Sequence, residues 1–284
     1  MYTGAAGMAV QQHTMDTISN NLANVDTTGY KEDVSVHEAF PEFLLRRMQV
    51  ELTPLPISTN APILGSVDRA PVVGKLGTGV AQDEVYTVFS QGSFKETTNP
   101  FDMALEGEGF FVVQTPYGER LTRNGSFHIG PEGLLVTKEG YPVLGENGTI
   151  DAKLNNFIVD QEGRIFRNDE FGDDPRRLVS MTENDWDDTV LVDRLRIVNV
   201  DESRYLQKQG SSLWATTWES GEAFNAEGDG RALVRQGFLE ASNVNAVKQM
   251  VRMIEVNRAY EANQKVIQSH DQASDKLINQ AMRF

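Results

Sequence analysis

Residues 1–30 read MYTGAAGMAVQQHTMDTISNNLANVDTTGY and contain no lysine or arginine. Apolar side chains recur in this stretch every seven residues, a spacing typical of a helix that packs along another helix. The repeating positions are Met1, Met8, Met15 and Leu22, with Ala5 and Ile18 at the intervening positions. Methionine at helical spacing is also common in ordinary cores. The pattern therefore predicts a helix and, as one of two interpretations, an assembly interface.

This helix is expected to end near Asn24. Residues 25–29 combine a β-branched valine, turn-forming residues and a glycine that accepts positive φ. A second helical pattern runs from about Ser242 to Phe284, with Ser242 or Asn243 available as its N-cap. A helix of about forty residues is roughly 60 Å long, more than a small β domain can cover. We therefore expect the two terminal helices to pack together as a helical coiled-coil layer, using Val244, Val247, Val251, Ile254, Tyr260, Ile267 and Leu277.

The other face of the carboxyl-terminal pattern is rich in uncharged amides. These residues are Gln249, Asn257, Asn263, Gln264, Gln268, Gln272 and Gln280. An uncharged hydrophilic face suits an aqueous lumen or a polar contact between helices. Gln264, Gln268 and Gln272 are the candidates for a lumen lining.

The middle of the chain has two different compositions. Residues 31–80 contain five prolines and four glycines, too many breakers for a regular core element, so they are predicted to be an extended connector with one short helical turn near residues 40–47. In residues 81–237, short β-branched and aromatic runs alternate with glycine turns, which predicts an antiparallel β domain. The predicted fold class is α+β, with domains 1–30, 31–80, 81–237 and 238–284, the last folding together with the first.

The net charge of the 284-residue chain is −15. Two acidic side chains and no basic side chain lie in residues 1–30, and residues 241–284 carry a net charge of +2, so residues 31–240 carry −15. This balance argues against a nucleic-acid partner, which needs a positive surface. No apolar stretch approaches the roughly 20 residues that span a bilayer, so no membrane insertion is expected. The chain also opens without the positive start and apolar run of a secretory signal, so any export is expected to use another route.

Enzyme motifs are absent from the sequence. Cysteine does not occur, and the four histidines, at positions 13, 37, 128 and 270, lack any metal-ligand spacing. The motif Gly107-Glu108-Gly109 reads as a turn, since it lacks the third glycine of a dinucleotide loop. The acidic stretch at residues 169–188 lacks the spacing of a calcium-binding EF-hand and reads as a solvated surface loop. We therefore expect no catalytic residue, no cofactor and no metal ligand.

Three segments resemble the rod and hook axial proteins of the bacterial flagellum. Residues 19–31 read SNNLANVDTTGYK and resemble the amino-terminal signature of that family, while residues 236–245 read QGFLEASNVN and resemble its carboxyl-terminal signature. Residues 99–111 and 122–127 resemble the β domain of the rod proteins. The signature positions are Asn20, Asn21, Leu22, Ala23, Asn24, Gly29, Tyr30, Ser242, Asn243, Val244 and Asn245.

The resemblance implies a structural subunit of the basal-body rod, the drive shaft that crosses the periplasm. Family members pack both terminal helices in concentric layers around a central channel, forming a hollow helical tube that transmits torque and carries exported subunits. The implied partners are copies of the chain, other rod and hook proteins, and the flagellar type III export apparatus. Residues 140–148 resemble the proximal-rod type and residues 77–80 the distal type, and a short hook-like subunit stays open as well. From another class, the alternative is a β-rich surface binding protein whose helices merely trimerise it.

Overall fold

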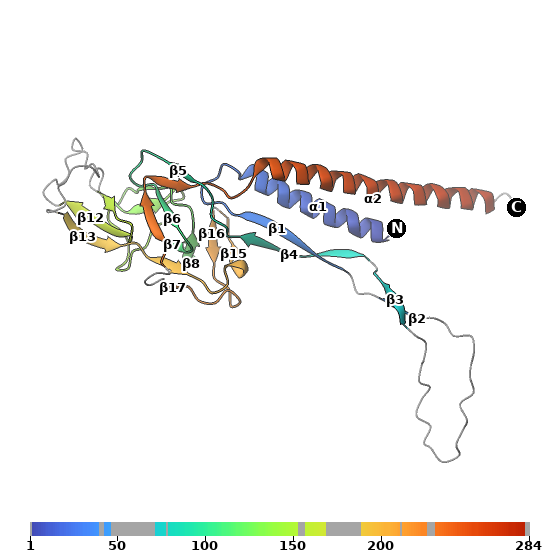
Figure 1. Ribbon diagram of the computed structural model, residues 1–284, viewed down its shortest axis with the longest axis horizontal. Coiled ribbons are helices and arrows are strands. Elements are labelled where there is room, and N and C mark those ends of the chain that lie inside the picture. The colour runs from blue at the N-terminus through green and yellow to red at the C-terminus, as the bar shows by residue number, and fades with distance from the viewer. Residues whose placement is uncertain are drawn as a thin grey trace, which may run out of the picture. The chain divides into compact units, whose positions relative to one another are not determined.

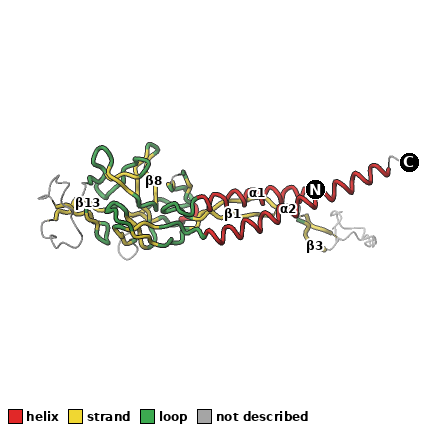
Figure 2. The backbone as a smooth tube through the Cα atoms, turned by 90° about the horizontal axis from the view of Figure 1, so that it is seen from above, coloured by secondary structure: helices red, strands yellow, loops and turns green. Residues whose placement is uncertain are grey.

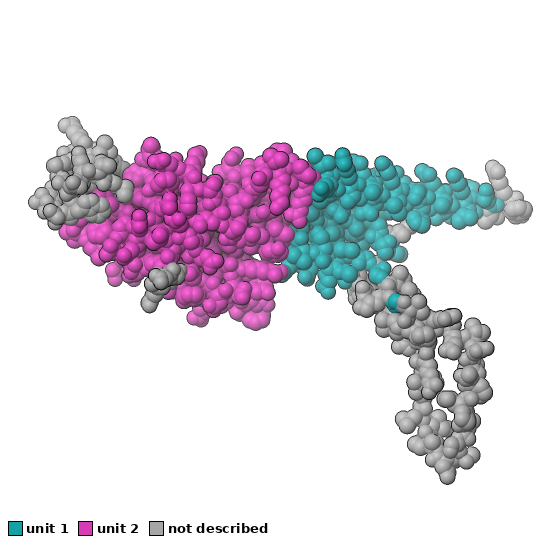
Figure 3. Space-filling view, viewed as in Figure 1, with its two compact units in different colours: residues 1–16, 35–84, 254–284 teal, residues 17–34, 85–253 magenta. Residues whose placement is uncertain are grey.

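The computed structural model describes residues 2–39, 43–46, 72–77, 79–152, 157–168, 189–210, 212–225 and 231–281. The chain divides into two compact units (Figure 3). Unit 1 comprises Met1–Asp16, Ser35–Glu84 and Ile254–Phe284, and unit 2 comprises Thr17–Val34 and Val85–Met253. Each unit is therefore built from segments that are far apart in the sequence.

The two ends of the chain form the two long helices, drawn in red in Figure 2, and the residues between them in the sequence form strands and loops. Helix α1 spans Tyr2–Ala23, close to the prediction, and helix α2 spans Ala246–Ala281. The predicted N-cap of α2 was wrong, because Asn245 Oδ1 accepts the Lys248 backbone N–H at 3.0 Å and so caps the helix. Asn243 is unavailable for capping since its side-chain amide bonds other strands.

Within unit 1, α1 and α2 approach each other at two glycines of α1. A Cβ atom added to Gly4 would lie 3.2 Å from Ile267 Cγ1, and one added to Gly7 would lie 3.0 Å from Asn263 Nδ2. Gly4 thus lies opposite Ile267 and Gly7 lies opposite Asn263, so the two helices run antiparallel here. Glycine permits this close approach because it lacks a side chain.

The strands, many of which are labelled in Figure 1, are short. They are β1 (Glu32–Ala39), β2 (Phe43–Arg46), β3 (Val72–Leu76), β4 (Val80–Val88), β5 (Phe94–Glu96), β6 (Met103–Glu106), β7 (Phe110–Thr115), β8 (Gly118–Thr122), β9 (Phe127–Ile129), β10 (Leu135–Thr137), β11 (Ile158–Val159), β12 (Arg164–Asn168), β13 (Thr189–Arg194), β14 (Ile197–Asn199), β15 (Gln207–Lys208), β16 (Leu213–Ala215), β17 (Phe224–Asn225), β18 (Leu233–Gln236) and β19 (Phe238–Glu240). A 3₁₀ turn, η3, covers Ser203–Tyr205. With the two helices, they confirm the α+β class.

The largest sheet has six strands in the order β15-β16-β8-β7-β14-β17, and its neighbours pair antiparallel. A three-stranded sheet, β11-β12-β13, and the pairs β1-β4, β10-β9, β18-β6, β19-β5 and β2-β3 complete the described pairing. In the β7–β8 hairpin, Phe111 lies opposite Thr122 and Thr115 opposite Gly118. The prediction of antiparallel strands with glycine turns is confirmed here.

Strand β7 has apolar side chains on both faces. Phe111 and Val113 belong to one buried cluster, in which the Phe111 and Phe127 rings meet edge to face at 5.2 Å. Phe110 and Val112 belong to a second cluster around Trp214. Successive residues of a strand point to opposite faces, which explains why residues 110–113 are apolar without interruption. This strand therefore joins the two cores of unit 2.

The predicted extended connector contains strands. The described part of residues 31–80 includes β1, β2, β3 and the start of β4, and the predicted helical turn is wrong because Phe43–Arg46 is strand β2. Leu44 pairs with Lys75 of β3, so ladder hydrogen bonds with a distant segment override the local pattern. The acidic stretch at residues 169–188 lies outside the described residues.

Candidate functional site

The described residues contain no group of three or more His, Cys, Asp or Glu side chains that could hold a metal ion. The four histidines lie on α1, β1, β9 and α2. Among the described helices, none is both long and apolar enough to span a bilayer. The candidate site is the place where the two signature segments, residues 19–31 and 236–245, meet. We call this place the signature junction.

Asn21 connects the amino-terminal signature segment to strand β1 through hydrogen bonds. Only 1% of it is exposed. Its Oδ1 accepts the Asp33 backbone N–H at 2.9 Å and the Tyr30 hydroxyl at 3.1 Å, while its Nδ2 donates to the Asp33 carbonyl at 2.7 Å. An amide side chain has both a donor and an acceptor, so Asn21 bonds the backbone of β1 as a neighbouring strand would.

Asn243 of the carboxyl-terminal signature also bonds the backbone of β1. Its Oδ1 accepts the Glu32 backbone N–H at 2.8 Å, and its Nδ2 donates to the Val88 carbonyl at 2.8 Å and to Ser90 Oγ at 2.9 Å. Consecutive N–H groups of β1, those of Glu32 and Asp33, are thus satisfied by one asparagine from each signature. These bonds join the two signature segments within unit 2.

Gly29 marks a close backbone contact. Its φ is +67°, and a Cβ atom added there would lie 2.6 Å from the Asn124 backbone nitrogen. The neighbouring Thr28 Oγ1 donates to Asn124 Oδ1 at 2.8 Å, and the Gly29 N–H donates to the Glu240 carbonyl at 2.9 Å. Only glycine fits both the conformation and the space. This position therefore holds both signatures against the β-domain segment around Asn124.

A buried charge cluster lies at the same junction. Lys31, which is 0% exposed, donates from Nζ to Glu240 Oε1 at 2.6 Å and to the Ser90 carbonyl at 2.8 Å. The Gly92 N–H also donates to Glu240 Oε1 at 2.9 Å, and Arg123 lies 3.8 Å from the other carboxylate oxygen. Burial lowers the pKa of the Lys31 ammonium, and Glu240 offsets part of this shift. Burial likewise lowers the pKa of the Arg123 guanidinium.

Tyr30 and Asp33 add a second polar group to the junction. The Tyr30 hydroxyl lies 3.4 Å from Asp33 Oδ2, and Lys208 Nζ bonds the same carboxylate oxygen at 2.8 Å. The ammonium of Lys208 also stands 4.1 Å from the centre of the Tyr30 ring. Burial, and after it the Asp33 carboxylate, raises the pKa of Tyr30 well above its ordinary value.

The remaining signature residues lie close by. Asn24 donates from Nδ2 to the Asn20 carbonyl at 2.8 Å, and Ser242 Oγ accepts the Val244 N–H at 3.2 Å. Leu22 is half-buried and Ala23 is exposed. The sequence pattern missed Lys31, Arg123 and Glu240, because charged residues are ordinarily expected on the surface.

The predicted assembly residues separate by burial. Ile18 and Val244 are buried inside the chain, and the half-buried members are Met8, Met15, Leu22, Tyr260 and Ile267. The exposed members are Ala5, Val247, Val251, Ile254 and Leu277, whereas Met1 lies outside the described residues. The exposed fractions are 71% for Val247, 51% for Val251, 54% for Ile254 and 68% for Leu277. The predicted assembly residues therefore differ in exposure, and the exposed ones are accessible to another molecule.

Gln264, Gln268 and Gln272 are all exposed on α2. Their spacing of four residues places them on one side of the helix. By contrast, Gln249 is almost completely buried, and its Nε2 donates to Glu32 Oε1 at 2.7 Å. The amide-rich face predicted from the sequence therefore includes one residue that serves the signature junction. The lumen assignment of the other three stays a prediction.

Three family models match the chain in the order of these segments. The model described as "Flagella basal body rod protein" matches residues 1–31. The model "Flagellar hook protein FlgE/F/G D1 domain" matches residues 104–167, and "Flagellar basal body rod FlgEFG protein C-terminal" matches residues 235–280. These matches cover α1, much of the β-rich middle and nearly all of α2.

Full-length relatives are similar as well. The flagellar basal-body rod protein FlgG of Buchnera aphidicola subsp. Schizaphis graminum is 33% identical over 281 residues, covering 98% of this chain and 97% of the relative. FlgG of Borreliella burgdorferi is 33% identical, with 95% and 94% covered. FlgF of Caulobacter vibrioides is 30% identical, with 98% and 96% covered.

Proposed function

Because this chain belongs to the family of flagellar basal-body rod proteins, as a structural subunit and not an enzyme, we propose that it assembles through α1 and α2 into a hollow helical tube. In this proposal the terminal helices form a coiled-coil layer around a channel. Other flagellar rod and hook proteins are its partners in the axis, and the flagellar export apparatus delivers it. The tube transmits torque and carries exported subunits.

The observation that carries this proposal is the exposed apolar face of α2. Val247, Met250, Val251 and Ile254 are each at least half exposed, and they follow one another at three- and four-residue steps. Contiguous apolar surface of this kind marks an association site. At roughly 25 cal/mol per Å² removed from water, covering such a face in every copy would stabilise an assembly.

The domain roles follow from the same proposal. Residues 1–30 and 238–284 form the assembled layer, and residues 81–237 form the outer β domain, which carries most of the excess negative charge. A charged surface suits a solvated position, here the periplasm. Export by the flagellar type III route is part of this proposal and rests on membership of the rod family.

The position within the rod has two candidate assignments. The resemblance of residues 140–148 favours the proximal type, whereas that of residues 77–80 favours the distal type. A short hook-like subunit is the remaining alternative. Labelled antibodies against this chain, applied to isolated basal bodies, separate these assignments by the height at which the label appears.

Electron microscopy of the purified protein under assembly conditions tests the proposal itself. We expect hollow tubes whose wall contains both helices. Discrete trimers with outward β domains would instead support a surface binding protein of another class. A basal body that keeps a complete rod when the gene is deleted would also contradict the rod assignment.

A further inference from the structure

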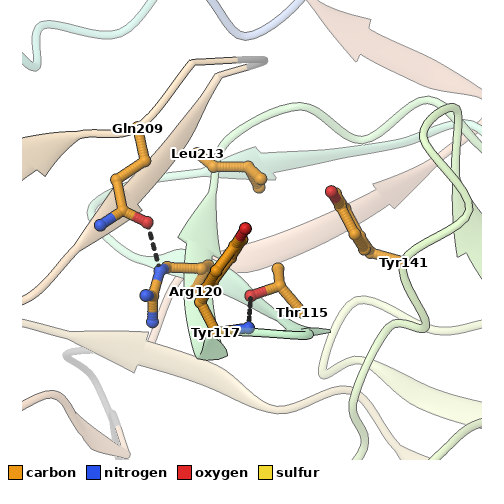
Figure 4. Close-up of a pocket in the computed structure, with 6 residues that line it drawn as sticks. All are labelled: Thr115, Tyr117, Arg120, Tyr141, Gln209 and Leu213. Atoms are coloured by element: carbon orange, nitrogen blue, oxygen red, sulfur yellow. Dashed lines mark hydrogen bonds between the residues drawn. The ribbon is translucent and has the colours of Figure 1, made fainter.

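A surface pocket of unit 2 lies beside the turn between β7 and β8. It has a volume of about 490 Å³ and is lined by Thr115, Tyr117, Arg120, Tyr141, Gln209 and Leu213 (Figure 4). Pockets of roughly 300 to 1,000 Å³ are typical of small-ligand sites. None of the residues that line it belongs to the signature segments or to the exposed face of α2, so rod assembly as described above does not account for it.

Two tyrosines form the walls of this pocket. Tyr117 is 84% exposed, whereas Tyr141 is half-buried and packs against the core. Figure 4 shows their rings on either side of a common space. Buried Leu213 adds an apolar surface. A tyrosine ring offers an apolar face together with a polar tip, and two of them form a slot suited to a flat ring that carries hydroxyl groups.

The turn that holds Tyr117 is ordered by its own hydrogen bonds. Thr115 Oγ1 donates to the Gly118 carbonyl at 2.7 Å and accepts the Tyr117 backbone N–H at 3.3 Å. Gly118 takes a φ of +100°, which closes the turn. The backbone under Tyr117 is therefore held before any ligand arrives, which lowers the entropy cost of binding.

Arg120 gives the pocket a positive charge. Its Nε donates to Gln209 Oε1 at 2.5 Å and its Nη1 to the Glu119 carbonyl at 2.7 Å, so the guanidinium is oriented by two neutral acceptors. The Glu119 carboxylate is engaged with Arg196 at 2.9 Å. Among the described residues, no carboxylate pairs with Arg120. Its remaining N–H groups suit a planar carboxylate.

We propose that this pocket binds a saccharide ring that bears a carboxylate. The flat apolar face of the sugar lies against the tyrosine rings, and its hydroxyls bond the tyrosine hydroxyls and the Gln209 amide. The carboxylate pairs with Arg120. A nucleic acid is a poor alternative, because one arginine on a chain of net charge −15 offers no phosphate track. The proposal stands independently of rod assembly.

Saturation-transfer NMR on the full chain tests this with two matched probes. Hyaluronan tetrasaccharide carries carboxylates, and chitotetraose is a neutral β-linked tetrasaccharide of similar size. We expect saturable binding of the first, about tenfold tighter than the second, the order expected for one charge-assisted pair. Absence of saturable binding of the charged probe would overturn the proposal, and equal binding of both probes would overturn the carboxylate assignment.

Three variants and one control distinguish binding in the pocket from non-specific binding elsewhere on the surface. Tyr117→Ala should weaken binding roughly tenfold, the upper range for an aromatic contact, while Tyr117→Phe retains most of it. Arg120→Gln should remove the preference for the charged probe. Trp218→Ala is the matched control, since Trp218 is 89% exposed and lies outside the pocket. If Trp218→Ala weakens binding as much as Tyr117→Ala does, or if Tyr117→Ala lowers only self-association in sedimentation, the saccharide site is refuted.

Discussion

Lys31 and Glu240 are 209 positions apart in the sequence, and a 2.6 Å ion pair between Nζ and Oε1 joins them in the interior of unit 2. Lys31 ends the amino-terminal signature and Glu240 lies within the carboxyl-terminal one. Neither is reached by solvent. The pair therefore links the segments that lead into both terminal helices to the same strands of the β-rich unit.

Lys31→Met tests the energetic weight of this pair. Removing the ammonium leaves Glu240 as a buried carboxylate with the Gly92 N–H and the more distant Arg123 guanidinium, and breaking a buried pair costs about 3–5 kcal/mol of unfolding free energy. Urea denaturation of the monomer measures the loss. The control is Arg164→Met, which breaks the ion pair of the exposed Arg164 with Asp160 and should cost far less, because water screens such a pair. Equal losses in the two variants would mean that Glu240 finds another partner.

The raised pKa of Tyr30 predicts a loss of stability in alkaline solution. The ordinary tyrosine pKa is 10.0, and an acid whose pKa is higher in the folded state holds more protons folded than unfolded above that pH. The free energy of unfolding then falls as the pH rises past about 10. Below that pH, the Tyr30 hydroxyl is protonated in both states and does not change it. Urea denaturation of wild type and Tyr30→Phe from pH 8 to 11 isolates the effect, because Lys31 is present in both. The wild type should lose stability more steeply above pH 10, and parallel curves would contradict the assignment.

Gly29→Ala should be more harmful than an ordinary glycine substitution. The new Cβ would meet the Asn124 backbone at 2.6 Å in addition to the strain of a positive φ. Gly140→Ala is matched in conformation, with a φ of +87°, but has no neighbour within 4 Å. We expect about 1 kcal/mol of destabilisation at Gly140 from φ strain alone and clearly more at Gly29. Thermal unfolding compares them, and similar melting temperatures would show that the Asn124 loop yields at little cost.

Val251→Asp tests the exposed face of α2 as an assembly surface. Val251 is half exposed, so the monomer should unfold at the same urea concentration as wild type. In an assembled layer the same carboxylate would be buried without a partner, at a cost of several kcal/mol in each copy, and motility should be lost. Asn257→Asp adds the same charge at an exposed polar position of α2 and serves as the control. Normal swimming of the Val251→Asp strain would show that this face of α2 is not part of the subunit interface.

Replacing Gln268 and Gln272 by leucine tests the lumen assignment. An uncharged hydrophilic wall neither binds apolar segments nor traps charges, whereas leucine would hold passing hydrophobic residues at roughly 25 cal/mol per Å² of contact. We expect normal rods with short or absent filaments, seen by electron microscopy. Filaments of normal length, or a density map that places these side chains in a dry subunit contact, would defeat the assignment.

Local patterns in the sequence were sufficient for the terminal helices and for the antiparallel strands between them. The apolar period of residues 1–24, the glycine-separated runs after residue 81 and the signature at residues 19–31 are all read within a few turns or strands of chain. The family resemblance also singled out Asn21, Gly29 and Asn243, and the structure shows which contacts each of them makes.

Only the tertiary structure decided which distant residues meet. The Lys31–Glu240 pair, the pairing of Leu44 with Lys75 and the burial of Gln249 of α2 beside Glu32 depend on segments that are remote in sequence. A charged residue is buried only when another part of the chain supplies its partner, and a short apolar run becomes strand rather than helix when a second strand completes its hydrogen bonds. Neither partner is encoded in the local pattern, so the interior of the signature junction becomes apparent only when the chain is folded.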